Sequence, residues 1–259
     1  MFSEKTVSID HNKCVGCALC VKDCPSGHLY LENEKAKTRE SGCIQCGHCY
    51  AVCPQNAVSM NNYDMRGCGE LTPMTDFESG KLLQAMKSRR SVRRFKDVPV
   101  EREKIEKILE AGRYSPTGSN AQDVSYTILG SRQGEMEKEC VRLFKSGQKL
   151  LSPFVSLVRN MDVGENFFFK GAPLVIVVSS GSAVDGGLAS SYMELMAESL
   201  GLGVLYSGFF VICAKISSKL SKMLRLPKGH KIVTCMVIGY PDVKYMRVAP
   251  RKPLQLREL

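Results

Sequence analysis

Eight cysteines near the start of the chain carry its clearest chemical signal, because they form two runs with identical spacing. The first run is Cys14, Cys17, Cys20 and Cys24-Pro25, and the second is Cys43, Cys46, Cys49 and Cys53-Pro54. This is the bacterial spacing for [4Fe–4S] clusters, in which the fourth cysteine of each run binds the other cluster. We therefore predict one cluster on Cys14, Cys17, Cys20 and Cys53, and a second on Cys43, Cys46, Cys49 and Cys24.

Two other uses of clustered cysteines fit this pattern less well. Zinc sites are usually built from paired Cys-x-x-Cys knuckles, not from triplets with a remote fourth ligand. A secreted disulfide scaffold would carry a signal peptide, and Met1–Lys5 opens no apolar segment of that kind. With twelve cysteines in all, we expect a reducing, cytoplasmic setting. The other four are expected to be free thiols, most of them buried: Cys68, Cys140, Cys213 and Cys235.

Length and charge narrow the classes of function. The 259 residues allow one large or two ordinary domains, and no apolar run reaches the roughly 18–20 residues of a membrane span. The net charge of +10 lies beyond residue 60, because the first 60 residues hold six cations and six acids. Each loaded cluster adds about −2, so an acidic module precedes a basic one. Basic charge without a nucleic-acid motif indicates anionic cofactors, substrates or acidic proteins, and we expect no nucleic acid.

Residues 1–62 are predicted to form a pseudo-twofold module, since Cys14 and Cys43 are 29 residues apart and their flanks repeat. Such a short segment buries little apolar surface, so the clusters would act as its core. The module closely resembles the bacterial two-cluster ferredoxins. Three histidines near the cysteine loops are expected to be solvated or hydrogen-bonded rather than ligands: His11, His28 and His48.

Residues 63–75 are predicted to be a linker, because they contain Gly-Cys-Gly and Thr-Pro. Residues 76–259 mix helices with strands, which predicts an α+β fold. Asp76 and Asp185 are expected to cap two of the helices. Helices are expected at 76–89, after Val98–Glu101, and at 135–145, 185–200 and 212–226, and strands at 124–129, 171–178 and 232–238. No Gly-rich phosphate loop follows the first of these strands, so there is no Rossmann fingerprint.

Four stretches of this second domain together resemble the FMN-dependent nitroreductase family. They are Arg89-Arg-Ser-Val-Arg93 with Phe95, Ser115-Pro-x-x-x-Asn120-x-Gln122, Glu198-Ser-Leu-Gly-Leu-Gly203, and Ile238-Gly-Tyr-Pro241 with Arg251-Lys-Pro253. The resemblance covers the whole second domain and implies an α+β fold that binds FMN at a homodimer interface. The whole chain is then similar to a ferredoxin–nitroreductase fusion.

The resemblance places the phosphate end of the flavin on cations. Arg89, Arg90 and Ser91 would hold the phosphate and ribityl chain, and Arg251 would return to the phosphate. Arginine is suited to bidentate phosphate contacts. A charge run of this kind is more often only a solvated face, and the residues alone leave that alternative open.

The ring end of the flavin is assigned in the same way. Arg93 would lie near the N1–C2=O edge, where a cation stabilises the reduced, anionic ring. Asn120 would hydrogen-bond the ring or ribityl chain. Gln122, in the same loop, is also expected to bind the flavin. The backbone around Ser207 and Gly208 would face N5.

The chain departs from the family where Asp123-Val124 follows Gln122, since members often have proline and an aromatic residue there. That loop borders the substrate, so the family does not fix the substrate preference. The second domain is also short, with little room for a lid. The apolar stripe of the 185–200 helix is expected to serve core and dimer packing.

The leading hypothesis is an FMN oxidoreductase in which two [4Fe–4S] clusters pass electrons from a low-potential donor to the flavin. The donor would be a ferredoxin or its reductase, with NAD(P)H as a second possibility, and the acceptor an electron-poor small molecule such as a nitroaromatic. One alternative is a flavin relay that serves a protein partner without small-molecule turnover. Another is a redox-sensing interaction protein that uses Cys68 or the clusters.

Overall fold

The computed structural model describes residues 6–65, 68–71, 78–151 and 161–259. The chain divides into two compact units. The first comprises Met1–Thr75 with Gly118–Ala121, and the second comprises Asp76–Thr117 with Gln122–Leu259. The predicted linker therefore groups with the first unit, and parts of it, with Asp76 and Phe77, lie outside the described residues.

The first unit consists of two antiparallel strand pairs and two one-turn helices. Strand β1 (Val7–Ile9) pairs with β4 (Val58–Met60), and β2 (Leu29–Glu32) pairs with β3 (Lys35–Thr38). Helices α1 (Leu19–Lys22) and α2 (His48–Ala51) each follow a residue with left-handed backbone, Ala18 and Gly47. The two helices occupy equivalent places in the repeat, so the backbone has the internal symmetry that the cysteine spacing predicts. A small core, in which Cys20 and Cys49 are buried, joins the halves.

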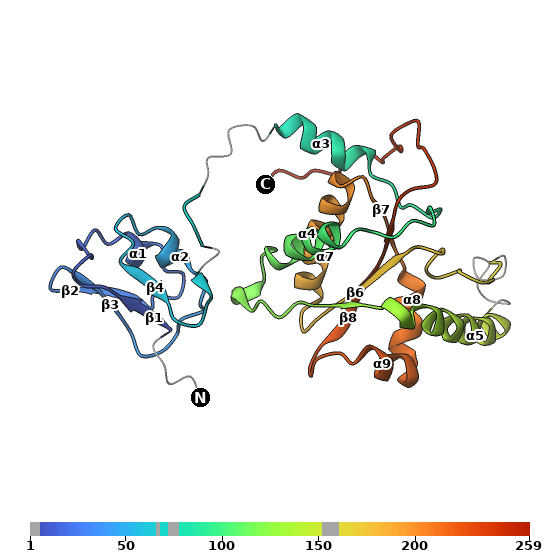
Figure 1. Ribbon diagram of the computed structural model, residues 1–259. Helices are drawn as coiled ribbons and strands as arrows, with labels where there is room; N and C mark the ends of the chain where they lie inside the picture. Colours follow the sequence, from blue (N-terminus) through green and yellow to red (C-terminus); the bar gives the residue numbers. More distant parts are fainter. Residues whose placement is uncertain (1–5, 66–67, 72–77, 152–160) are drawn as a thin grey trace. The chain divides into compact units, whose positions relative to one another are not determined.

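The second unit is built around a four-stranded antiparallel sheet in the order β5-β6-β8-β7 (Figure 1). Its strands are β5 (Ser125–Ile128), β6 (Leu174–Ser180), β7 (Gly203–Tyr206) and β8 (Lys231–Gly239). Every residue of β6 is buried, which agrees with its uninterrupted apolar sequence. The central pair runs from Leu174 opposite Ile238 to a bulge at Val178/Ser179.

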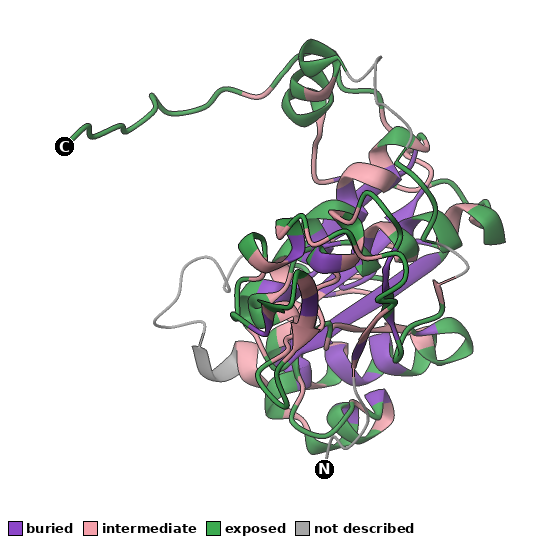
Figure 2. Cartoon of the chain, turned by 90° about the vertical axis from the view of Figure 1, so that its left-hand side faces the viewer, coloured by how far each residue is buried: buried purple, intermediate pink, exposed green. Residues whose placement is uncertain are grey.

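Helices cover both faces of this sheet, because side chains of a strand alternate between its faces. Val175 and Val177 face one core, which involves α5 (Gln133–Leu151), α8 (Gly208–Ile216) and α9 (Ser218–Leu224). Leu174 and Ile176 face the other core, with α4 (Arg102–Arg113) and α7 (Ala183–Ser199). The result is the α+β fold predicted from the sequence. Figure 2 shows the buried strands between the helices.

Several local predictions differ from the structure. Ser182, not Asp185, caps α7, because its Oγ accepts a hydrogen bond from the backbone N–H of Asp185 at 3.3 Å. The predicted helix 212–226 is two helices, since Ser217 adopts an extended conformation (ψ 112°) between α8 and α9. Helix α3 (Ser79–Ser88) buries none of its residues, and the side chain of Leu83 is 50% exposed.

Short 3-10 turns also occur among the described residues. They are η2 (Gly118–Asn120), in the predicted polar loop, and η3 (Gly130–Arg132), just before α5. Residues 251–259 form an exposed terminal segment (Figure 2). No helix in the described part of the chain is long and apolar enough to cross a membrane.

Candidate functional site

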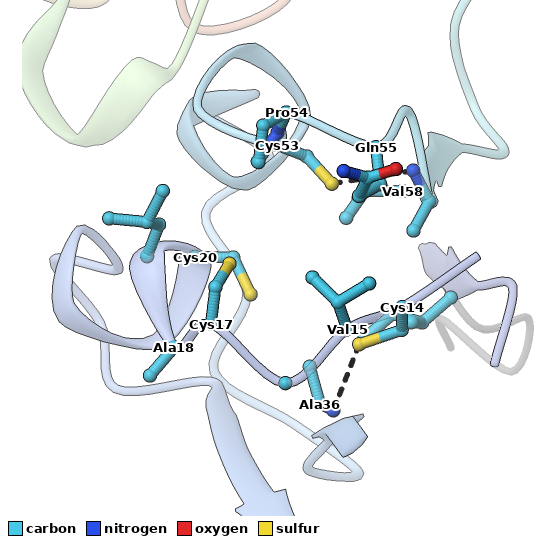
Figure 3. A pocket seen from close by; sticks show the side chains of 14 residues that line it. Cys14, Val15, Cys17, Ala18, Cys20, Ala36, Cys53, Pro54, Gln55 and Val58 are labelled. Atoms are coloured by element: carbon cyan, nitrogen blue, oxygen red, sulfur yellow. Dashed lines mark hydrogen bonds between the residues drawn. The ribbon is translucent and has the colours of Figure 1, made fainter. Parts of the chain in front are cut away.

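Two hollows in the first unit gather the eight cysteines of the two runs. The first hollow is lined by Cys14, Cys17, Cys20 and Cys53, and the second by Cys24, Cys43, Cys46 and Cys49. Figure 3 shows the sulfur atoms of the first set turned toward a common space. Each hollow thus takes three cysteines from one run and the fourth from the other, which is the ligand exchange that two-cluster ferredoxins show.

The spacing of the two runs favours a cluster over a single ion in each hollow. Among the described residues, no three His, Cys, Asp or Glu side chains converge closely enough to hold one metal ion. A zinc ion draws its four ligands within about 2.3 Å of one centre. A cube bonds each thiolate to a different iron, so its sulfur ligands stand further apart.

The first hollow is apolar and provides two backbone hydrogen bonds to sulfur. The N–H of Ala36 donates to Cys14 Sγ at 3.5 Å, and the N–H of Ala57 donates to Cys53 Sγ at 3.3 Å. Apart from the cysteines, its lining is almost entirely aliphatic, with Gln55 as the exception. Hydrogen bonds to the sulfurs and the exclusion of water both tune a cluster's reduction potential.

The second hollow has two backbone donors and a hydroxyl. The N–H of His28 donates to Cys24 Sγ at 3.2 Å, and the N–H of Gln45 donates to Cys43 Sγ at 3.4 Å. Ser26 Oγ lies 3.6 Å from Cys24 Sγ. The hydroxyl has no counterpart among the described hydrogen bonds to sulfur in the first hollow.

The electrostatics of the thiols follow their burial. Burial raises the pKa of Cys49 to about 11, and burial together with the neighbouring cysteines raises the pKa of Cys20. Burial also acts to raise the pKa of Cys24, but hydrogen bonds, first from Ser26 and then from the N–H of His28, outweigh it and lower that pKa. Iron must therefore displace protons from the buried thiols when a cluster is inserted.

The histidines near the loops are hydrogen-bonded or exposed. His28 Nδ1 lies 3.0 Å from the carbonyl oxygen of Ser41, and His48 Nδ1 lies 3.2 Å from Asp23 Oδ2. His11 is exposed. The cysteines outside the two runs are all unpaired, with Cys68 exposed and the other three buried: Cys140, Cys213 and Cys235. The prediction of free, mostly buried thiols is confirmed.

In the second unit, the predicted phosphate residues lie along the edge of β7. Ser91 forms a bridge with Val204, and the N–H of Val92 donates to the Val204 carbonyl at 3.0 Å. A Cβ on Gly203 would stand 2.4 Å from Val92 Cγ2, so only glycine permits this approach. The Gly-Leu-Gly sequence before β7 thus lets the arginine segment lie against the sheet.

The arginines of this segment have different partners. Arg89 Nη1 donates to Glu194 Oε1 of α7 at 2.6 Å, an ion pair that the sequence did not predict. The guanidinium of Arg90 lies over the ring of Tyr245, 5.8 Å from its centroid. Arg93 Nη1 donates to the carbonyl oxygen of Ser91 at 3.2 Å.

A second cation, missed by sequence reasoning, lies near Arg93. Burial lowers the pKa of Lys170, the Glu137 carboxylate raises it, and Arg93 lowers it further, so the two cations repel each other. None of the ion pairs among the described residues involves Lys170 or Arg93. Glu137 accepts hydrogen bonds from the N–H groups of Phe168 and Phe169 at 2.8 and 3.0 Å, which fixes the backbone before Lys170. Arg93 and Lys170 therefore place two cations near one another, with the Glu137 carboxylate acting on Lys170 as well.

The remaining predicted flavin residues are spread over both units. The N–H of Ser207 donates to the carbonyl oxygen of Cys235 at 2.8 Å, whereas Gly208 opens α8, where backbone N–H groups lack helical partners. Asn120 groups with the first unit and donates to the carbonyl oxygen of Gln45 at 2.9 Å. The N–H of Gln122, in the second unit, donates to Thr117 Oγ1 at 3.0 Å, and Arg251 is exposed.

Comparisons with known proteins agree with both halves of this description. Residues 86–240 match the Nitroreductase family, and residues 6–68 match the 4Fe-4S dicluster domain. The NADPH-dependent oxidoreductase of Staphylococcus haemolyticus is 28% identical over 184 residues, covering 66% of this chain and 69% of that protein. The NADPH-flavin oxidoreductase of Vibrio harveyi is 25% identical over 177 residues, covering 66% and 70%.

Solved structures show the same fold for the second unit. A nitroreductase with bound FMN from Desulfitobacterium hafniense has a TM-score of 0.58 and 23% identity, covering 68% of this chain and 98% of that one. A nitroreductase with bound FMN from Bacteroides fragilis has a TM-score of 0.55 and 20% identity, covering 69% and 99%.

Proposed function

This chain belongs to the nitroreductase family and begins with a 4Fe-4S dicluster domain, and from that premise we propose that it is an FMN oxidoreductase supplied by its own clusters. Electrons from a low-potential donor enter the clusters and reach FMN, which when bound supplies hydride transfer to an electron-poor acceptor such as a nitroaromatic. The observation that carries the proposal is that one chain holds two four-cysteine hollows and a nitroreductase fold.

The residues of the second unit fit a flavin phosphate and an anionic ring. Arg90 and Ser91 lie on the segment beside β7 and would hold the phosphate, with Arg89 released from Glu194. Arg93 and Lys170 would face the N1–C2=O edge and stabilise negative charge there. Gly208 would offer its free N–H toward N5. The other predicted contacts, from Asn120, Gln122, Ser207 and Arg251, stay predictions.

We propose the eight cysteines as the ligands, in the two sets that the hollows gather. The reducing cytoplasm would keep these thiolates available for iron. The donor is a ferredoxin or its reductase, and the names of the two relatives add NADPH as a candidate.

We also propose that the active form is a homodimer. Helix α7 exposes Val184, Leu188 and Tyr192 at successive turns, and Ile212 and Ile216 of α8 are exposed at the same spacing. Apolar stripes on two helices of one unit favour an interface that excludes water. The occupant we propose is a second copy of this chain.

The test is anaerobic reconstitution with iron, sulfide and FMN, followed by visible spectra with reduced ferredoxin and, separately, with NADPH. We expect two clusters and one flavin per chain, bleaching by one of the two donors, and turnover of a nitroaromatic. The variant Arg93→Gln should lose reduction of the acceptor, whereas Arg102→Gln on the exposed face of α4 should not.

Three results would count against the proposal. A reconstituted protein without flavin, or one whose flavin no donor reduces, contradicts it. Flavin that is reoxidised by a protein partner but by no small acceptor shows a relay instead. An absence of any electron flux in steady state shows a sensor.

A further inference from the structure

The two cluster hollows are repeats of one another, and one of the equivalent positions at which they differ follows the Cys-Pro pair of each run. Cys24-Pro25 is followed by Ser26, whereas Cys53-Pro54 is followed by Gln55. The backbone donors are balanced, with two N–H groups directed at sulfur in each hollow. Ser26 Oγ adds a contact to Cys24 Sγ at 3.6 Å. The described hydrogen bonds include none from the side chain of Gln55 to a sulfur.

The direction of this contact follows from the state of the sulfur. A cysteine that binds iron is a thiolate and has no proton to give, so the hydroxyl of Ser26 must be the donor. A hydrogen bond to an ionised acceptor is stronger than one between neutral groups. Since a cluster becomes more negative when it accepts an electron, the Ser26 hydroxyl stabilises the reduced state more than the oxidised state.

The wider lining of the two hollows points the same way. The second hollow includes the side chains of Ser26, His28 and His48, whereas Gln55 is the one polar residue beside the cysteines of the first. Polar surroundings favour the more highly charged, reduced cluster, and aliphatic surroundings disfavour it. Hydrogen bonding and polarity therefore act together rather than against each other.

We propose that Ser26 makes the cluster of the second hollow, on Cys24, Cys43, Cys46 and Cys49, the easier of the two to reduce. The first electron from a low-potential donor, such as dithionite or a reduced ferredoxin, reduces that cluster. The cluster of the first hollow is reduced only at a lower potential. The inference deepens the proposed role of the clusters as an electron supply. It depends on the two clusters and not on the flavin or the acceptor.

The test is an anaerobic redox titration of the reconstituted full chain, followed by electron paramagnetic resonance. Hyperfine-shifted cysteine protons in nuclear magnetic resonance spectra assign each potential to a hollow. We expect two midpoints, with the higher one on the second hollow. Ser26→Ala should lower that midpoint by about 59 mV, which corresponds to a tenfold change in the one-electron equilibrium. Ser26→Thr keeps the hydroxyl, so the midpoint potential of the second hollow should stay at its native value.

Substitutions at the equivalent position supply the matched controls. Gln55→Ala should leave both midpoints unchanged, and Gln55→Ser should raise the lower one by installing a hydroxyl beside Cys53. Iron and sulfide content shows that each variant holds both clusters.

Three results would overturn the inference. They are equal midpoints in the native chain, first reduction of the first hollow, and a Ser26→Ala variant that leaves the higher midpoint in place. A chain that lacks flavin activity but shows the expected midpoints supports this inference while contradicting the proposed enzyme.

Discussion

The ion pair between Arg89 and Glu194 predicts that replacing one partner destabilises the fold much more than replacing the other. The side chain of Glu194 is 10% exposed, and that of Arg89 is 25% exposed. Burial raises the pKa of Glu194, although Arg89 and the hydroxyl of Tyr206 act to lower it. The desolvation of the carboxylate therefore exceeds the attraction that the pair returns, as is common for buried pairs.

The balance between desolvation and attraction determines how much each of two substitutions changes the free energy of unfolding. Glu194→Gln removes the costly charge and leaves a guanidinium that still reaches solvent, so the free energy of unfolding should change by less than about 1 kcal/mol. Arg89→Gln leaves a buried carboxylate that keeps the Tyr206 hydroxyl as its hydrogen-bond partner, and should cost about 3 kcal/mol at pH 8.

The pH dependence follows from the direction of the pKa shift. A carboxyl whose pKa is higher in the folded chain than in the unfolded chain contributes most when protonated, and that contribution is lost as pH rises through the folded pKa. The deficit of Arg89→Gln should therefore shrink from pH 8 to pH 5, and Glu194→Gln should show no such trend.

The assay is urea unfolding of the reconstituted chain under anaerobic conditions, followed by far-ultraviolet circular dichroism. Arg102→Gln, which breaks an exposed pair with Glu106, should change stability by less than about 0.5 kcal/mol and serves as the control. The reasoning fails if Glu194→Gln costs as much as Arg89→Gln, or if the Arg89→Gln deficit grows toward acid pH.

Three further predictions test packing and assembly in the second unit. Gly203→Ala should lower the free energy of unfolding by about 1–3 kcal/mol, because it forces a Cβ against Val92. Gly187→Ala has open space around it and should not lower stability. The midpoints of urea unfolding distinguish the two variants. Glu137→Gln should cost about 1–3 kcal/mol in the same assay, because one of the two backbone N–H groups loses its acceptor; an unchanged midpoint would contradict this. Tyr192→Asp should shift the light-scattering mass from two chains to one, and a dimer that survives it would place the interface elsewhere.

The parts of the molecule that could be predicted from sequence are those that local spacing determines. The sorting of eight cysteines into two sets follows from a repeat with a fixed offset, and the structure places the same sets in two hollows. The central strands β6 and β8 were recognisable as apolar runs because they are buried on both faces.

Local ambiguity explains the smaller errors. Ser182 and Asp185 are both residue types that cap helices, and they stand three positions apart at the start of α7, so composition does not choose between them. The break between α8 and α9 falls at Ser217, without a glycine or proline to mark it.

The charged residues that sequence reasoning missed share a different cause. Glu194 is 105 positions from Arg89, and Lys170 comes from the segment before β6 while Arg93 comes from the segment beside β7. Each pair forms only because the sheet brings distant segments together. Neither the spacing nor the composition of the sequence predicts such a pair. Glu194 also matters for any anionic ligand at Arg89, because its carboxylate already accepts a hydrogen bond from that guanidinium. If flavin binding releases Arg89 from Glu194, breaking this ion pair lowers the net affinity for FMN. The Glu194→Gln variant should therefore bind FMN more tightly than the native chain.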